Sequence, residues 1–256
     1  MKDLWQRLGA KARVITLKGR TDREEHAKKA AEQVGLDIEF FYADRHPRGG
    51  EYGCFDSHQQ VCRLALENGE KIAIVLEDDF EPVKDFTNLS ENEVTKQVEY
   101  LALKEAIDLI QSKDNWEIMY LGVLPNIFQH SELVGKYCYK LKPWSSTHAM
   151  IVNEKYMKKI VSWTWREDIK DAYDARHRTC EEAYATHPII FRQFDSPSDI
   201  RSSQTHAPNY IRDLPVHIAG WYAVNIGTGL PHFSMLLLII LFITYYISKM
   251  GWITVD

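Results

Sequence analysis

Residues 71–80 read K-I-A-I-V-L-E-D-D-F, and this stretch decides how the rest of the chain is interpreted. The apolar run at residues 72–76 is unbroken, is rich in β-branched side chains and follows the helix-ending pair Asn68-Gly69. Such a run is typical of a strand that is buried on both faces of a parallel sheet. The sequence therefore predicts an α/β fold built around a mixed, mostly parallel central sheet.

Three carboxylates, Glu77, Asp78 and Asp79, follow this strand directly. Open α/β sheets bind ligands outside the carboxyl ends of their strands, which is where these side chains would lie. Adjacent acids repel one another unless a positive group lies between them, and a hard divalent cation such as Mn²⁺ or Mg²⁺ suits oxygen ligands and usually binds phosphates as well. The alternative is that the acids only keep a strand end soluble or cap a helix.

Composition limits the possible classes of protein. The chain has 256 residues, a net charge of −5 and a pI near 6.1, which fits one large α/β domain or a domain with an appendage. No basic stripe is visible, so we expect no nucleic-acid partner. The four cysteines form no C-x-x-C pair, and we expect reduced thiols in a cytosolic compartment.

The C-terminal region has a different character. Residues 233–247 carry no charge, and residues 230–248 make a run of nineteen, close to the roughly 20 that cross a bilayer. We expect a catalytic domain at residues 1–205, a linker at 206–229 and a single-pass membrane tail anchor at 230–250. Because residues 1–11 contain no signal peptide, the domain would lie on the cytosolic side. A buried core helix is the alternative for the apolar run.

The first strand is predicted at residues 13–17, and a helix follows from Thr21 to the glycine at position 35. A strand, a turn and a helix N-terminus together form a place for an anion. Arg20 and Arg23 could reinforce such a site, or they could be solvated charges of the first helical turn.

The second strand is predicted at residues 38–42, and Asp44 follows it. An acid at this point could bind a ribose or a base, or it could only begin the turn before Pro47. The loop at residues 48–53 is rich in glycine, but neither G-x-x-x-x-G-K-[ST] nor G-x-G-x-x-G occurs in the chain. P-loop NTPases are thereby excluded, and dinucleotide-binding dehydrogenases are disfavoured.

A helix is expected at residues 54–67, with one apolar stripe that consists of Cys54, His58, Val61, Cys62 and Ala65. Cys54, His58 and Cys62 could in principle bind a soft metal. We interpret them as core residues, because three ligands along one helix surround an ion poorly.

Further along, we expect a helix at residues 95–110 and strands at 116–121, 137–142, 149–152 and 189–194. Residues 125–136 and 143–148 are predicted to be loops. A charged stretch between residues 168 and 182 is predicted to be helical.

Several segments, in this order and spacing, resemble glycosyltransferase family 25, the lipooligosaccharide and procollagen hydroxylysine galactosyltransferases. They are V-I-T-L-K-G-R-T-D-R (14–23), G-E-Y-G-C-F-D-S-H (50–58), I-V-L-E-D-D (74–79), W-E-I-M-Y-L-G (116–122), T-H-A-M-I-V (147–152) and R-Q-F-D-S-P-S-D-I (192–200). The most specific part is G-C-x-x-S-H followed by L-E-D-D about twenty residues later.

The resemblance implies a GT-A-like fold and inverting transfer of a sugar, galactose or glucose, from a UDP-sugar to a hydroxyl of a glycan, lipid-linked or protein acceptor. The expected donor-binding residues are Thr16, Leu17, Arg20, Arg23, Asp44, Ser57, His58, Glu77 and Asp78. The metal ligands would be Asp78 and Asp79 with a late histidine, His206 or His187. Asp171 and Asp174 are the candidates for the catalytic base, or they are surface acids.

The chain departs from the family pattern in places. Thr16 stands where the family usually has asparagine, Met150 replaces a frequent aromatic residue, and the acid that follows the T-H-A segment has no unique counterpart. Two alternatives therefore stay open beside the glycosyltransferase. One is another nucleotide-phosphate transferase on a similar sheet, and the other is a non-catalytic, membrane-anchored interaction module.

Overall fold

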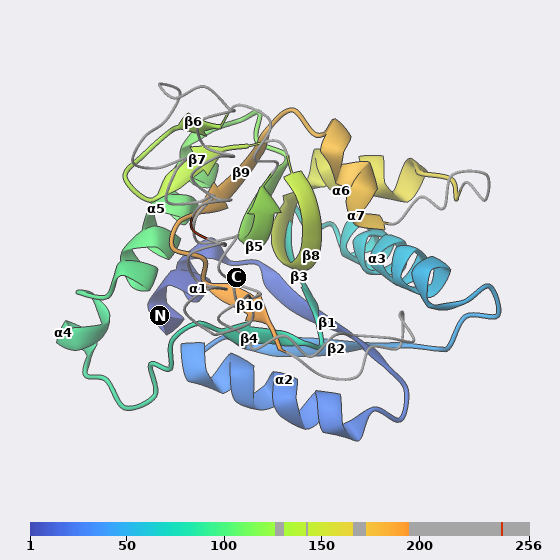
Figure 1. Cartoon of the computed structure of the whole chain (residues 1–256), viewed down its shortest axis with the longest axis horizontal. Coiled ribbons are helices and arrows are strands. Elements are labelled where there is room, and N and C mark those ends of the chain that lie inside the picture. The colour runs from blue at the N-terminus through green and yellow to red at the C-terminus, as the bar shows by residue number, and fades with distance from the viewer. Residues whose placement is uncertain (126–130, 142, 166–172, 195–241, 243–256) are drawn as a thin grey trace, which may run out of the picture.

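The computed structural model describes residues 1–125, 131–141, 143–165, 173–194 and 242. These residues form an eight-stranded sheet in the order β2-β1-β3-β8-β5-β9-β7-β6 (Figure 1). The strands are β1 (Lys11–Leu17), β2 (Ile38–Ala43), β3 (Ile72–Glu77), β5 (Ile118–Pro125), β6 (Glu132–Leu133), β7 (Cys138–Lys140), β8 (Pro143–Asn153) and β9 (Ala183–Thr186). Only β8 and β7 run against the other six, so the predicted mixed, mostly parallel sheet is confirmed.

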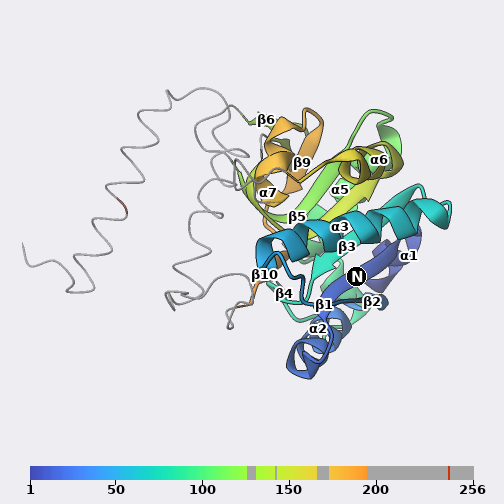
Figure 2. The ribbon, with the colours of Figure 1, turned by 90° about the vertical axis from the view of Figure 1, so that its right-hand side faces the viewer.

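Helices cover both faces of the sheet (Figures 1 and 2). One face packs against α1 (Lys2–Leu8), α2 (Thr21–Val34), α4 (Glu91–Val94) and α5 (Val98–Ser112). The other packs against α3 (Gly50–Glu67), α6 (Glu154–Ser162) and the short α7 (Tyr173–Arg176), which continues into the 3-10 turn η2 (His177–Thr179). A separate two-stranded sheet pairs β4 (Phe80–Pro82) with β10 (Phe191–Gln193).

The apolar run of β3 divides its side chains between the two faces. Ile74 and Leu76 lie in the core beneath α2 and α5, whereas Ala73 and Val75 lie in the core beneath α3 and α6. All four side chains are fully buried. Successive residues of a strand point to opposite faces, so a strand that is covered on both sides must be apolar throughout. This is the physical reason why the run decides the fold.

The early predictions agree well with the observed elements. Strands β1, β2 and β3 lie where the sequence indicates, and α2 ends at Gly35 in the left-handed conformation that a glycine C-cap favours. The later predictions are weaker. The expected loop at residues 143–148 belongs to the long strand β8, and β9, which directly follows the stretch at 168–182 that was predicted to be helical, was not predicted.

Among the described residues, none of the helices combines the length and the apolar character needed to cross a bilayer. This finding corrects the expectation of a single-pass membrane anchor with the rest of the chain on the cytosolic side. The segment behind that expectation, residues 230–250, lies outside the described residues except for Phe242, and so does the proposed linker at 206–229.

A buried ion pair ties the first strand to the segment that precedes β3. The guanidinium of Arg13 on β1 is 2% exposed and donates to both carboxylate oxygens of Glu70, at 2.7 and 2.5 Å. Burial acts to raise the pKa of Glu70, but the hydrogen bonds and the charge of Arg13 outweigh it, so that the pKa lies below its ordinary value of 4.5. The exposed Glu39 is the second acid near Arg13, at 3.8 Å.

We predict that Glu70→Gln lowers the free energy of unfolding at pH 7 by about 3 kcal/mol, because it leaves the Arg13 charge buried without its carboxylate. Since the folded-state pKa of Glu70 is depressed, its contribution is complete above pH 4.5 and is lost as the pH falls through the depressed value. Urea unfolding of both proteins at a series of pH values should show a constant difference in the free energy of unfolding above pH 4.5. Below pH 4.5 this difference should become smaller. Glu39→Gln is the control, with a change below about 1 kcal/mol, and equal losses in the two variants would contradict the assignment.

Candidate functional site

Three parallel strands end at the same edge of the sheet and fix the position of Glu77, Asp78 and Asp79, which we call the acid row. In the register of β1 with β3, Ile15 is opposite Glu77, and in that of β1 with β2, Leu17 is opposite Ala43. The pairing extends one residue beyond β3, because the backbone N–H of Asp78 donates to the carbonyl of Ile15 at 3.1 Å. The carboxyl ends of β1, β2 and β3 thus meet in one place.

A cavity of about 360 Å³ lies at this edge. Its lining includes nine of the residues that the sequence singles out for donor or metal binding: Thr16, Leu17, Arg23, Asp44, Ser57, His58, Glu77, Asp78 and Asp79. Arg20 is not part of the lining, and its guanidinium pairs with Asp22 at 2.8 Å. Residues that are far apart in the sequence therefore come together as the strand-end argument expects.

Asp78 is held by the first strand and by the helix that follows it. The hydroxyl of Thr16 donates to one carboxylate oxygen at 2.6 Å, and the guanidinium of Arg23 donates to the other at 3.3 Å. Burial raises the pKa of Asp78, and these two contacts offset only part of that effect.

The acid row already has a positive neighbour from the chain itself. The guanidinium of Arg23 on α2 lies 3.3 Å from Asp78 and 3.8 Å from Asp79, and its side chain is only 7% exposed. From the sequence we expect a divalent cation to reduce the repulsion between the acids. In the structure the guanidinium of Arg23 already reduces part of this repulsion.

Glu77 has its own partners, which come from α3 and β8. Its carboxylate accepts a hydrogen bond from Thr147 on β8 at 2.9 Å and lies 3.2 Å from Nε2 of His58 on α3. The His58 ring stacks on Tyr173 with 4.1 Å between the ring centroids. Burial acts to raise the pKa of Glu77, but its contacts with His58 and Thr147 prevail and the pKa is lowered.

The first turn of α3 forms another part of the cavity lining. Gly49, Gly50 and Gly53 line the cavity there. The N-cap residue is Gly49, so no N-cap side chain accepts a hydrogen bond from the N–H groups of the first turn. The free N–H groups and the dipole of an eighteen-residue helix favour an anion at such an end. Glycines let a ligand approach the backbone closely.

The predicted stripe of α3 divides between two environments. Cys62, Val61 and Ala65 are buried in the core, as expected, whereas Cys54 and His58 line the cavity. The ligand atoms of Cys54, His58 and Glu77 all lie within 4.8 Å of one another. The interpretation of the stripe as core therefore holds, since His58 is fully buried and Cys54 packs against the same apolar cluster, and these two residues line the cavity as well.

Of the candidates for the catalytic base and the third metal ligand, the structure describes Asp174 and His187. Asp174 on α7 is outside the cavity lining, but its carboxylate accepts a hydrogen bond from the backbone N–H of Ser146, a non-glycine residue at φ 78°. Burial raises the pKa of Asp174, and the nearby charge of Glu77 raises it further. His187 is not part of the lining, and Asp171 and His206 lie outside the described residues.

Sequence reasoning missed several residues of this site. Arg45 and His46 follow β2 and line the cavity, and Thr147 contacts Glu77 from β8. The position of Arg45 and His46 directly after a strand is a signal that could have identified them. Thr147 begins the segment T-H-A-M-I-V that resembles glycosyltransferase family 25, but its contact with Glu77 depends on the pairing of β3 with β8, which the sequence does not give.

Neither a protein-family model nor a curated protein sequence matches the chain. Among solved structures, the chain is similar to a glycosyltransferase involved in the glycosylation of the major capsid of PBCV-1, with 13% identity over 74% of this chain and 95% of that chain and a TM-score of 0.41. It is also similar to a protein from STIV, with 10% identity over 77% of this chain and 100% of that one and a TM-score of 0.36. A third is a mutant of Drosophila β1,4-galactosyltransferase 7 in complex with manganese, UDP-Gal and xylobiose, with 9% identity over 80% of this chain and 79% of that chain and a TM-score of 0.35. The resemblance to glycosyltransferase family 25 rests on the sequence motifs.

Proposed function

We propose that this chain is a metal-dependent, inverting glycosyltransferase that moves a hexose, galactose or glucose, from a UDP-sugar to a hydroxyl of a glycan, lipid-linked or protein acceptor. The observation that carries the proposal is one cavity whose lining combines two features. One is the acid row after β3, and the other is the glycine-rich N-terminus of α3. A nucleotide diphosphate with a divalent cation matches both, since the phosphates suit the helix end and the cation suits the acids.

The charges of the cavity lining favour this kind of ligand. The lining contains four carboxylates, those of Asp44, Glu77, Asp78 and Asp79, and two guanidinium groups. A bare diphosphate would be repelled by such a surface, whereas a diphosphate that carries a divalent cation would not. The proposal therefore includes Mn²⁺ or Mg²⁺ as a cofactor.

Asp78 and Asp79 are the residues that would hold this cation. Both offer hard oxygen ligands, and their side chains are 20% and 22% exposed toward the cavity that they line. When bound, the cation would stabilise the negative charge that develops on the departing nucleotide. Arg23 lies beside the same two acids and would add a second positive charge.

We propose that the remaining lining residues bind different parts of the UDP-sugar. Thr16 and Leu17 at the end of β1 and Asp44 after β2 would contact the nucleoside, with Asp44 accepting a hydrogen bond from the ribose or the base. Ser57 and His58 on α3, together with Glu77, would contact the sugar, and all three line the same cavity.

Asp174 is the described acid that we propose as the base for the acceptor hydroxyl. It is close enough to Cys54 and Glu77 for its charge to raise the pKa of Cys54 and for the charge of Glu77 to raise its own pKa. A carboxylate with a raised pKa accepts a proton more readily near neutral pH. The hydrogen bond from Ser146 fixes the orientation of its carboxylate.

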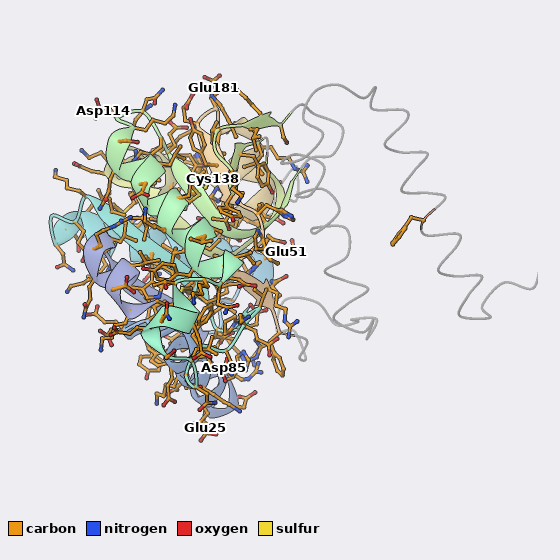
Figure 3. All side chains as sticks on the ribbon, turned by 90° about the vertical axis from the view of Figure 1, so that its left-hand side faces the viewer. Glu25, Glu51, Asp85, Asp114, Cys138 and Glu181 are labelled. Carbon is orange, nitrogen blue, oxygen red and sulfur yellow. The ribbon has the colours of Figure 1, made fainter. Side chains whose placement is uncertain are left out.

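We predict that the full-length protein turns over a UDP-sugar in the presence of Mn²⁺, and that Asp79→Asn lowers this rate by about 100- to 1,000-fold, the range for the loss of one group that stabilises transition-state charge. A panel of UDP-sugars and nucleoside triphosphates, each with and without Mn²⁺, provides the measurement. Asp85→Asn is the matched control, because Asp85 lies on the surface outside the cavity lining (Figure 3). Turnover of a nucleoside triphosphate alone would favour a nucleotidyltransferase, and wild-type rates for Asp79→Asn would refute the site.

We further predict that Asp174→Asn lowers kcat by about 100- to 10,000-fold, as expected for the loss of a general base, while the affinity for the UDP-sugar stays within a factor of about 3 because Asp174 is outside the cavity lining. Steady-state kinetics and equilibrium binding of the donor separate the two effects. A loss of donor affinity with unchanged kcat would show that Asp174 only supports Glu77, and unchanged kinetics would exclude it as the base.

A further inference from the structure

Three side chains of the cavity lining, one of which is the first member of the acid row, offer donor atoms of three different kinds. Cys54 offers a sulfur, His58 a ring nitrogen and Glu77 a carboxylate oxygen, and these atoms all lie within 4.8 Å of one another. They come from two elements, α3 and the end of β3. Glu77 supplies the ligand from outside the helix that the sequence stripe lacked.

From this arrangement we propose that Cys54, His58 and Glu77 form a Zn²⁺ site that is distinct from the oxygen ligands Asp78 and Asp79. The inference does not depend on the proposed transfer reaction, because it concerns only which cation the three side chains bind. It gives the cavity two chemically different cation positions, one with mixed ligands and one with oxygen alone.

The distances fit a single tetrahedral ion. Zinc binds nitrogen and oxygen ligands at about 2.0–2.1 Å, which places two such ligands about 3.3 Å apart around a tetrahedral ion. Nε2 of His58 and Oε1 of Glu77 are 3.2 Å apart. The two atoms could therefore take up a shared ion with little movement, and only the sulfur of Cys54 needs to adjust by rotation about its side chain.

The helix geometry brings the first two ligands together. Cys54 and His58 are four residues apart on α3, so their side chains project from the same face on successive turns. Two ligands at this spacing with a third from another element are a common arrangement around zinc, and the ligand set leaves one position open. All three side chains line the cavity, so water or an anionic group from the cavity could complete the coordination.

The chemistry of the ligands selects the cation. A thiolate and an imidazole favour Zn²⁺ or Co²⁺ over Mg²⁺ and Mn²⁺, which prefer oxygen. Neighbouring contacts already orient two of the ligands, because Thr147 donates to Glu77 and Tyr173 stacks on the His58 ring. The hydrogen bond from Thr147 is the kind of outer contact that orients a ligand carboxylate in a metal site.

Titration of the reduced, chelator-treated full-length protein with Co²⁺ tests the site. We expect one equivalent to bind with a thiolate-to-cobalt charge-transfer band, and Zn²⁺ to displace it. Cys54→Ser should abolish the band and weaken Zn²⁺ binding by more than about 100-fold, since even outer contacts of a zinc site are worth 10- to 100-fold. Glu77→Gln should weaken Zn²⁺ binding but keep the band.

Two variants serve as controls. Cys62→Ser removes a buried thiol on the same helix and should leave the band unchanged, and Asp79→Asn should leave Zn²⁺ binding unchanged because it alters only the oxygen position. Far-UV circular dichroism verifies that each variant is folded, and Cys54→Ala replaces Cys54→Ser if the latter is not. The proposal is overturned if the wild type gives no band, if the band persists without Cys54, or if Asp79→Asn removes it.

Discussion

The hydrogen bond from the backbone of Asp78 to Ile15 extends the pairing of β1 and β3 beyond the last residue of β3. It keeps the chain extended where the acids begin, and it brings the hydroxyl of Thr16 within 2.6 Å of the Asp78 carboxylate. A backbone hydrogen bond contributes only about 1 kcal/mol by itself. Its importance is geometric, because the acid row, the end of β1 and the first turn of α2 with Arg23 all take their relative positions from it.

The charges of the site are arranged before any ligand arrives. Each of the three consecutive acids has a partner from a different element: His58 from α3 lies beside Glu77, Thr16 from β1 contacts Asp78, and Arg23 from α2 lies near both aspartates. These contacts reduce the cost of burying like charges side by side. When the polar groups of a site are already oriented, the free-energy cost of ordering them on ligand binding is small.

The sequence was informative wherever a property depends on neighbouring residues. The uninterrupted apolar run predicted β3, and the strand-end rule brought Thr16, Asp44 and the acid row to one cavity edge. It failed where a contact depends on distant segments. Residues 143–148 look like a loop because they are polar, yet they complete β8, and Ser146 has a positive φ there. The stripe of α3 shows the same limit, because helical periodicity identifies one face but cannot tell where that face leaves the core and meets the cavity.

Among the residues that the structure describes, those that line the cavity lie from Ile15 to Asp79. The second half of the sheet reaches this region through contacts such as that of Thr147 with Glu77. A substitution at Thr147 would therefore remove a hydrogen bond that orients a lining carboxylate without replacing any of these lining residues.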